Sequence, residues 1–222
     1  MTFTDFWTPI KLSIEIASVA GIIAILVGVL VGKFMAKRTF RGKVIIETIM
    51  LLPLVLPPTV IGFLLIIIFG KNSFVGQSIE WLFGQPIMFT MLAAIVASAV
   101  VAFPLMYQTV RTGFEAVDGD IENAARVDGA SEWQIFFFIT LPMAKHALIA
   151  GSILCFARAL GEFGATLMFA GNLPGKTQTT PLAIYTAISG NNMTLAWLWV
   201  ASMIILSFIL LMSVHAIQKR DA

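Results

Sequence analysis

Long apolar runs are the feature that most restricts how this chain can fold. A helix that crosses a lipid bilayer needs roughly 20 consecutive, mostly apolar residues. Four stretches plainly meet that length, and they cover residues 12–34, 44–69, 87–110 and 195–217. A fifth stretch, residues 135–158, is interrupted by Pro142, Lys145 and His146. Only 12% of the residues are charged, against about 25% in an average soluble domain. We therefore expect an all-α integral membrane protein with five transmembrane helices.

Short connections between the expected spans argue against a second folded domain. We expect a single transmembrane domain over residues 1–222, whose longest cytoplasmic connection is an insert at about residues 112–135. The formal net charge is only +2, and basic residues gather beside apolar runs. That pattern is typical of membrane topology rather than of nucleic-acid binding. Membrane lipid is therefore an expected partner of this chain, and nucleic acid is not.

The distribution of basic residues predicts the orientation, because the cytoplasmic flanks of spans carry an excess of Lys and Arg. Five basic residues lie around the first connection: Lys33, Lys37, Arg38, Arg41 and Lys43. If that connection is cytoplasmic, five more join it on the same side: Arg111, Arg126, Lys145, Lys219 and Arg220. Three then face outward: Lys11, Lys71 and Lys176. We expect a cell-membrane protein with its N-terminus outside and its C-terminus in the cytoplasm.

Prolines predict departures from straight spans. Pro53, Pro57 and Pro58 interrupt the second apolar run, and Pro142 is expected to bend the fourth span, because proline removes a backbone hydrogen bond. Between the fourth span and about Asn192 we expect an irregular outer segment.

The cytoplasmic insert has the sequence of two short helices joined at an angle. Asp120 is suited to accept a hydrogen bond from the first turn of a helix over residues 121–128. Gly129 suits the left-handed position that follows a helix. Ser131 and Gln134 then form the capping-box pattern that starts the next helix.

One face of the first insert helix offers a place for a partner. Ile121, Ala124 and Ala125 recur at the spacing of a single helix face, where two small residues let another surface approach closely. Glu122 lies in the first turn, where a carboxylate complements the positive helix end. The helix could instead lie against this protein's own spans, and the residues alone leave both interpretations open.

The insert resembles the conserved-loop signature of ABC-importer permeases, in which Glu-Ala-Ala is followed after three residues by Gly and after nine more by Ile-x-Leu-Pro. This chain has Asn-Ala-Ala at residues 123–125, then Gly129, then Ile-Thr-Leu-Pro at residues 139–142, with every spacing kept. Asn123 stands where the signature has Glu, and Glu122 comes one residue earlier. The resemblance implies a helix that inserts into a cleft on a cytoplasmic ATPase subunit and transmits its motion to the spans. The implied coupling residues are Glu122, Asn123, Ala124, Ala125 and Gly129.

Two longer stretches narrow the resemblance to one branch of that family. Residues 39–65 and 156–185 are similar to the molybdate permeases, and the similarity runs over nearly the whole length. Sulfate permeases share much of the second stretch but more often have Tyr where this chain has Phe163. The resemblance implies molybdate import, with tungstate, sulfate or thiosulfate as alternatives. It also implies alternating access in a homodimer that is attached to ABC ATPase subunits and fed by an extracytoplasmic molybdate-binding protein. ATP is then used by the partner subunit, and no cofactor is expected in this chain.

A loosened phosphate-loop pattern occurs at residues 170–177. A nucleotide-binding loop joins a strand to a helix, whereas this one follows an expected span and falls on the outer side, where ATP is scarce. We expect a turn there, and we do not expect the chain to be an enzyme. His146 and His215 are isolated, so no catalytic set and no metal-ligand spacing can be built from them.

Two opposite charges near membrane depth are the main candidates outside the insert. Arg158 and Glu162 are four residues apart, which allows a pair on one helix face, and Thr166 adds a hydroxyl one turn later. Ionisable groups inside a bilayer are costly enough to mark functional sites. These residues are candidates for the translocation pathway, with Arg158 screening a carboxylate that would otherwise repel molybdate. The alternative, which we prefer, is a structural pair that pins the end of the helix.

A proton-coupled secondary transporter is the rival from another class. It would use Glu162 as its proton site and would need no ATPase. Uptake by the purified protein in vesicles distinguishes the two hypotheses, because only the rival is driven by a proton gradient alone.

Overall fold

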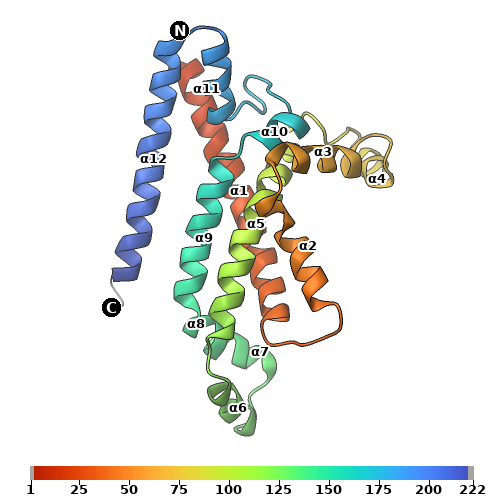
Figure 1. Cartoon of the computed structure of the whole chain (residues 1–222), viewed down its shortest axis with the longest axis vertical. Coiled ribbons are helices and arrows are strands. Elements are labelled where there is room, and N and C mark those ends of the chain that lie inside the picture. Colours follow the sequence, from red (N-terminus) through yellow and green to blue (C-terminus); the bar gives the residue numbers. More distant parts are fainter. Residues whose placement is uncertain (1–2, 220–222) are drawn as a thin grey trace.

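The computed structural model describes residues 3–219, and every regular element in that part of the chain is a helix (Figure 1). The first half contains α1 (Phe3–Ala36), α2 (Lys43–Val55), α3 (Pro58–Phe69), α4 (Phe74–Phe83) and α5 (Met91–Glu115). The second half contains α6 (Gly119–Val127), α7 (Glu132–Ile135), the π-helix η1 (Phe136–Thr140), α8 (Leu141–Met143), α9 (Lys145–Leu160), α10 (Gly164–Phe169), α11 (Thr180–Ser189) and α12 (Met193–Lys219). The expected all-α fold is confirmed.

Three long helices, α1, α5 and α9, pack together in the centre of the molecule. They approach closely because α1 carries small residues at every fourth position, Ala20, Ala24, Gly28 and Gly32. A Cβ atom added at Gly28 would lie only 2.8 Å from Cγ of Met106 on α5. Lipid gives no hydrophobic driving force between helices, so such small residues make the close backbone contact on which packing in a membrane depends.

Apolar length identifies the helices that can cross a membrane. Helices α1, α5 and α12 are long and apolar enough to do so individually. The number reaches five if each of two bent helix pairs, α2 with α3 and α7–α8 with α9, forms one span. The five expected apolar runs therefore correspond to these five units.

The second apolar run, residues 44–69, is interrupted at Pro57 and Pro58 as expected, but not at Pro53, which lies inside α2. It divides into α2 and α3, whose axes are bent by 118°. Leu56 and Pro57 have extended backbone at the break, and Pro58 starts α3. Two successive prolines remove two backbone donors, so the helix cannot continue through them. Helix α3 instead packs on α10, where a Cβ at Gly62 would meet Met168.

The fourth span is bent as expected, although the break lies just after Pro142. The α7–α8 segment meets α9 at 72°, and Ala144 at the junction has φ −87° and ψ 8°. Before the proline, the backbone widens into a π-helix in which Leu141 N–H donates to the Phe136 carbonyl, five residues back. Such π-turns and prolines are the usual physical causes of sharp helix bends.

The outer segment that was expected to be irregular up to Asn192 contains two helices, α10 and α11. Helix α11 begins at Thr180, whose backbone N–H donates to Ser13 Oγ of α1 at 2.7 Å. The Ser13 hydroxyl in turn donates to Thr180 Oγ1 at 3.0 Å. This buried contact joins residues 167 positions apart, so the expectation failed because it rested on local signals only.

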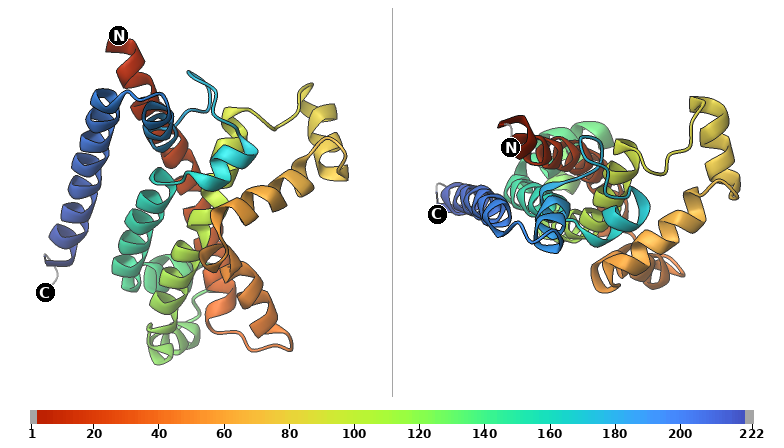
Figure 2. Two further views of the ribbon diagram at one scale, coloured as in Figure 1. Left: turned by 45° about the horizontal axis from the view of Figure 1, so that its top comes forward. Right: turned by 90° about the horizontal axis from the view of Figure 1, so that it is seen from above.

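The helices define two ends of the bundle (Figure 1). Helix α6, the connection between α1 and α2, and the last turns of α12 lie at one end, called here the α6 end, whereas α11 lies at the other. From above, α3 and α4 project from one side of the bundle and α12 lies on the opposite side (Figure 2). Side chains are described for residues 6–213. Arg220, one of the ten residues used for the orientation, lies outside the described part of the chain.

Candidate functional site

The connection between α5 and α7 forms the expected pair of short helices, but α6 begins earlier than expected. Asp118, not Asp120, is the N-cap residue: its Oδ1 accepts a hydrogen bond from the Asp120 backbone N–H at 2.9 Å. The backbone already turns helical at Gly119, which places Asp120 inside the first turn. The helix accordingly ends at Val127, one residue before the expected end.

The end of α6 and the start of α7 confirm the sequence prediction. Gly129 has φ +86°, the left-handed conformation that glycine adopts most easily. Its N–H donates to the Arg126 carbonyl at 3.1 Å, and Ala130 N–H donates to the Ala125 carbonyl at 3.0 Å, which together make a Schellman motif. Ser131 then caps α7 in a complete capping box with Gln134.

Glu122 points from α6 back into the protein, where its side chain meets groups from two other helices. One carboxylate oxygen accepts a hydrogen bond from Lys37 Nζ at 2.8 Å, just beyond the end of α1. The other accepts one from the Thr140 hydroxyl at 2.7 Å, at the end of η1. Burial alone would raise the pKa of Glu122, but the hydrogen bonds from Lys37 and Thr140 outweigh that effect and hold the pKa below its ordinary value. The carboxylate is therefore ionised and ties α6 to α1 and η1.

The opposite face of α6 is turned to the outside. Asn123 and Ala124 are exposed, Ile121 is 43% exposed and Val127 is 88% exposed, whereas Ala125 is half-buried. One side of α6 therefore lies against the protein's own helices, as one of the two interpretations expected, and the other side is exposed.

Arg126 braces α6 against α7 at the exposed surface. Its Nε and Nη2 atoms donate to the two carboxylate oxygens of Glu132 at 2.6 and 3.1 Å. Its Nη1 donates to the Asn123 side-chain carbonyl at 2.8 Å. A guanidinium fork that binds both oxygens of a carboxylate fixes direction as well as distance. The angle between the two short helices is thus held by side chains as well as by Gly129.

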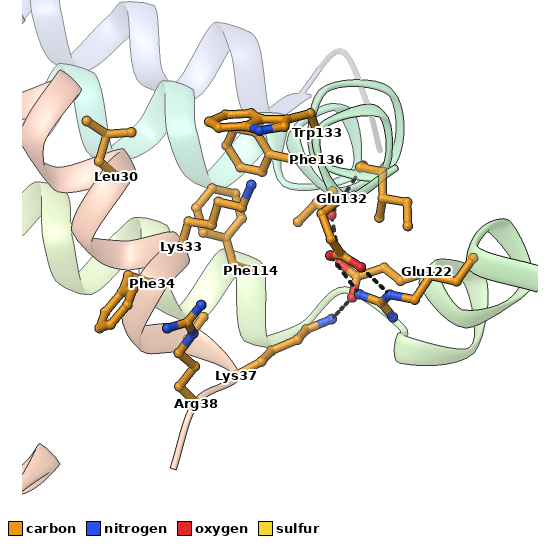
Figure 3. A pocket seen from close by; sticks show the side chains of 14 residues that line it. Leu30, Lys33, Phe34, Lys37, Arg38, Phe114, Glu122, Glu132, Trp133 and Phe136 are labelled. Atoms are coloured by element: carbon orange, nitrogen blue, oxygen red, sulfur yellow. Dashed lines mark hydrogen bonds and ion pairs between the residues drawn. The ribbon is translucent and has the colours of Figure 1, made fainter. Parts of the chain in front are cut away.

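A pocket of about 510 Å³ opens between the end of α1 and the α6, α7 and η1 segments (Figure 3). Lys33, Lys37 and Arg38 line one side of it, and Trp133 and Phe136 line the other. In the sequence, these basic residues indicated only the orientation of the chain in the membrane. Their clustering around the end of α1 can be read from the sequence. The aromatic residues that face them lie about 100 positions later in the chain, so no local pattern showed this contact.

Arg158 and Glu162 form the expected ion pair, with Arg158 Nη1 at 2.7 Å from Glu162 Oε2. The other carboxylate oxygen accepts a hydrogen bond from the Ala165 backbone N–H at 2.8 Å, in the first turn of α10. The Glu162 side chain is only 1% exposed, against 30% for Arg158. Thr166 lies on α10 and is fully buried, and its hydroxyl has no hydrogen-bond partner within the described residues. The structure thus brings Arg158 and Glu162 together and joins Thr166 to neither.

A second charged group between spans was missed by the sequence analysis. Glu47 on α2 accepts from Arg111 of α5 at 3.0 Å and lies 3.7 Å from Lys43. The Tyr107 hydroxyl donates to the same carboxylate at 3.4 Å. The available signal was a Glu in one apolar run and a Tyr in another, but nothing local showed that they meet.

Residues 170–177 form a loop after α10, with Gly171 and Gly175 at positive φ. The Thr177 hydroxyl accepts from Leu173 N–H at 3.0 Å and donates to the Gly171 carbonyl at 3.2 Å. The loop therefore closes on itself through a turn, as expected, and it follows a helix rather than a strand.

Comparison with known proteins identifies relatives of this chain. Residues 20–221 match the family described as "Binding-protein-dependent transport system inner membrane component". The YvgM protein of Bacillus subtilis strain 168 is 58% identical over 98% of this chain and 95% of its own length. The ModB molybdenum transport system permease protein of Escherichia coli K12 is 42% identical over 85% of this chain and 82% of its own. An inward-facing structure of the MetNI methionine ABC transporter superposes with a TM-score of 0.77, at 17% identity and over the full length of both chains, and so shares the fold. The chain therefore belongs to the family of binding-protein-dependent transport system inner membrane components.

Proposed function

We propose that this chain is the membrane subunit of an ATP-driven importer that carries molybdate into the cell. It works with a separate ABC ATPase and an extracytoplasmic molybdate-binding protein. The observation that carries the proposal is the arrangement of α6. This short helix is exposed on one face, and its other face is joined to the spans. The substrate is inferred from the similarity to ModB, which is named as a molybdenum transport permease.

The α6 end is proposed to face the cytoplasm. Basic residues gather there, at the end of α1 and on α6 itself, and an excess of Lys and Arg is characteristic of cytoplasmic flanks. This places the N-terminus outside and the C-terminus inside. Helix α6 is then on the side of the membrane where an ATPase can reach it and where ATP is available.

Helix α6 is proposed to be the docking element for the ATPase. Its exposed face, with Ile121, Asn123 and Ala124, enters the cleft of that subunit, and the half-buried Ala125 at its edge lets the two surfaces approach closely. Glu122, on the inner side of α6, holds the helix in position for this contact. It links α6 to the end of α1 through Lys37 and to η1 through Thr140. Gly129 supports the same arrangement by holding the turn after the helix.

Two copies of the chain are proposed to enclose the route between them. ATP binding closes the ATPase pair, α6 passes that movement to the spans, and the cavity opens outward to receive molybdate. Hydrolysis then returns it to the inward-facing state. The free energy for the change comes from contacts that differ between the two states. The proposed polar groups along the route are the Arg158–Glu162 pair and the Thr166 hydroxyl, which has no hydrogen-bond partner among the described residues.

The rival proton-coupled mechanism is less well supported by the surroundings of Glu162. Both of its carboxylate oxygens are engaged, one by the Arg158 guanidinium and the other by the Ala165 N–H. A carboxylate fixed in this way neutralises a cation and caps a short helix. The rival mechanism would require Glu162 to exchange both of these partners during transport.

Reconstitution tests the proposal. The full chain is placed in vesicles with its ATPase inside and its binding protein outside, and uptake of molybdate, tungstate, sulfate and thiosulfate is compared. We expect uptake of molybdate that needs ATP and both partners. Uptake driven by a proton gradient without ATPase would overturn the mechanism, and transport of sulfate in preference to molybdate would overturn the substrate.

A further inference from the structure

The pocket at the α6 end carries more positive than negative charge (Figure 3). Four cations line it, Lys33, Lys37, Arg38 and Arg126, against two carboxylates, Glu122 and Glu132. Both carboxylates already have partners, because Lys37 binds Glu122 and Arg126 binds Glu132. The excess charge of the pocket therefore resides on Lys33 and Arg38.

Lys33 and Arg38 lie against aromatic rings instead of carboxylates. Lys33 Nζ is 3.5 Å from the ring centroid of Phe136 and 5.0 Å from that of Trp133. The guanidinium carbon of Arg38 is 4.2 Å from the centroid of Phe34. Neither side chain forms an ion pair with a carboxylate in the described part of the chain. A ring face orients a cation without neutralising it, so both charges remain available to an anion.

The pocket lies where the apolar part of α1 ends. Leu30 and Phe34 line it and are 62% and 49% exposed, and Trp133 is 66% exposed. Beside it, the aromatic residues Phe137 and Phe138 are also exposed. Exposed aromatic residues next to Lys and Arg at the end of a span are characteristic of the membrane–water interface. This end of the molecule thus offers an apolar rim for acyl chains and a cationic interior for a headgroup.

We propose that this pocket binds the phosphate of an anionic phospholipid headgroup, held by Lys33 and Arg38. Basic pockets beside spans favour such headgroups, since the phosphate replaces the missing carboxylates while the acyl chains stay in the bilayer. A free phosphate ion would use the two cations but not the exposed Leu30 and Phe34. The inference rests on the proposed placement of the α6 end at a membrane surface, and it is independent of the transported substrate.

A lipid bound in this pocket would lie next to α6, the helix proposed to dock onto the ATPase. Lys37 follows Lys33 by four residues and holds Glu122 of α6, while Trp133 belongs to α7. A headgroup bound to Lys33 would therefore lie at the end of α1, beside the ring of Trp133 that Lys33 already contacts.

Lipid binding to the purified full chain tests this inference. Native mass spectrometry measures binding of phosphatidylglycerol and of phosphatidylcholine, with inorganic phosphate as a competitor. The double variant Lys33→Gln/Arg38→Gln is compared with Lys71→Gln/Lys176→Gln, which removes the same charge from exposed sites elsewhere. We expect phosphatidylglycerol to bind at least about tenfold more weakly to the pocket variant and unchanged to the control.

Three results would overturn the proposal. These are equal losses in the two double variants, equal binding of the two lipids to the unaltered chain, and displacement of phosphatidylglycerol by inorganic phosphate at similar concentration, which would indicate a free-anion site. The charge-preserving variant Lys33→Arg/Arg38→Lys keeps the test independent of misfolding, because it should retain phosphatidylglycerol binding. Transport is not measured in any arm, so the outcome is separate from that of the uptake experiment.

Discussion

Glu122 places a negative charge where only 6% of the residue is exposed, and there Lys37 neutralises it while the Thr140 hydroxyl donates a second hydrogen bond. Asn123, its neighbour, stands where the family signature has a glutamate and faces outward. Glu122 thus attaches the helix to the protein's own spans, whereas Asn123 lies at the surface, where its side-chain carbonyl accepts a hydrogen bond from Arg126. We assign the carboxylate at position 122 to positioning and the surface around position 123 to docking.

Removing the Glu122 carboxylate should weaken the attachment of α6. Glu122→Ala is expected to lower the free energy of unfolding by about 1–3 kcal/mol, because Lys37 and Thr140 lose the acceptor of a charge-assisted hydrogen bond. Asn123→Ala, the matched control at an exposed site, should change it by less than about 0.5 kcal/mol. Chemical unfolding in detergent measures both. Similar losses in the two variants would contradict the inward role of Glu122.

The lowered pKa of Glu122 predicts the direction of a pH effect. When α6 is detached, the carboxyl returns to its ordinary pKa of 4.5, and in the folded protein the pKa is lower. The stabilisation is therefore complete at neutral pH and is lost as the pH falls through that range. Hydrogen exchange of α6 amides, corrected for intrinsic rates, should show decreasing protection below pH 4.5. Glu122→Gln should weaken this dependence more than Glu132→Gln does, because Glu122 is buried whereas Glu132 pairs with Arg126 at the exposed surface.

At the scale of elements, α6 is a separate short helix because both of its ends are capped. Asp118 satisfies its first turn, and the Schellman motif at Gly129 satisfies its last. The capping box at Ser131 starts α7 two residues later, so the chain changes direction within very few residues. The resulting angle directs the exposed face of α6 away from the spans.

A substitution at Gly129 tests the effect of backbone conformation by itself, because an added side chain would not collide with neighbouring atoms there. A Cβ at Gly129 meets nothing within 4 Å, and the same is true at Gly119, but only Gly129 has positive φ. Gly129→Val should therefore be strained by its backbone alone, at about 1–2 kcal/mol or more. We expect it to abolish co-purification with the ATPase, while Gly119→Ala retains it. Normal co-purification of the Gly129 variant would show that this turn does not support docking.

At the scale of the whole molecule, α9 connects the α6 end with the opposite half. It begins at Lys145, beside α8, and reaches Arg158 roughly 20 Å further along its axis. There the Arg158–Glu162 pair and the Ala165 N–H fasten α9 to α10, which in turn packs on α3. The proposed docking element and the proposed route residues thus lie at two ends of one central helix.

Because these two sites are far apart, we expect that molybdate uptake can be impaired without impairing ATPase binding. Arg158→Ala leaves the nearly buried Glu162 without its cation and should reduce molybdate uptake by at least about tenfold. ATPase binding should stay within about twofold, because α6 and its contacts are untouched. Uptake in vesicles and co-purification measure the two effects. Equal loss of both would point to misfolding of the whole chain.

Features encoded by neighbouring residues were predictable from the sequence. The apolar runs identified the membrane-spanning units, since crossing a bilayer depends on local length and hydropathy. The Gly129 turn, the Ser131 capping box and the Arg158–Glu162 pair involve residues at most five positions apart, so local backbone geometry brings their members together. Pro57, Pro58 and Pro142 also indicated where helices would break, although not the angles that followed, whereas α2 continues through Pro53.

The tertiary structure alone decided which distant residues meet. Lys37 and Glu122 are 85 positions apart, and Ser13 and Thr180 are 167 apart, so no local pattern could pair them. The same holds for the 118° break between α2 and α3, whose direction depends on the packing of α3 against α10. The sequence by itself determined an all-helical membrane protein with a short capped helix between two of its spans. Packing of the spans decided that Glu122 faces inward, because the position of its partners depends on how α1 and η1 lie beside α6.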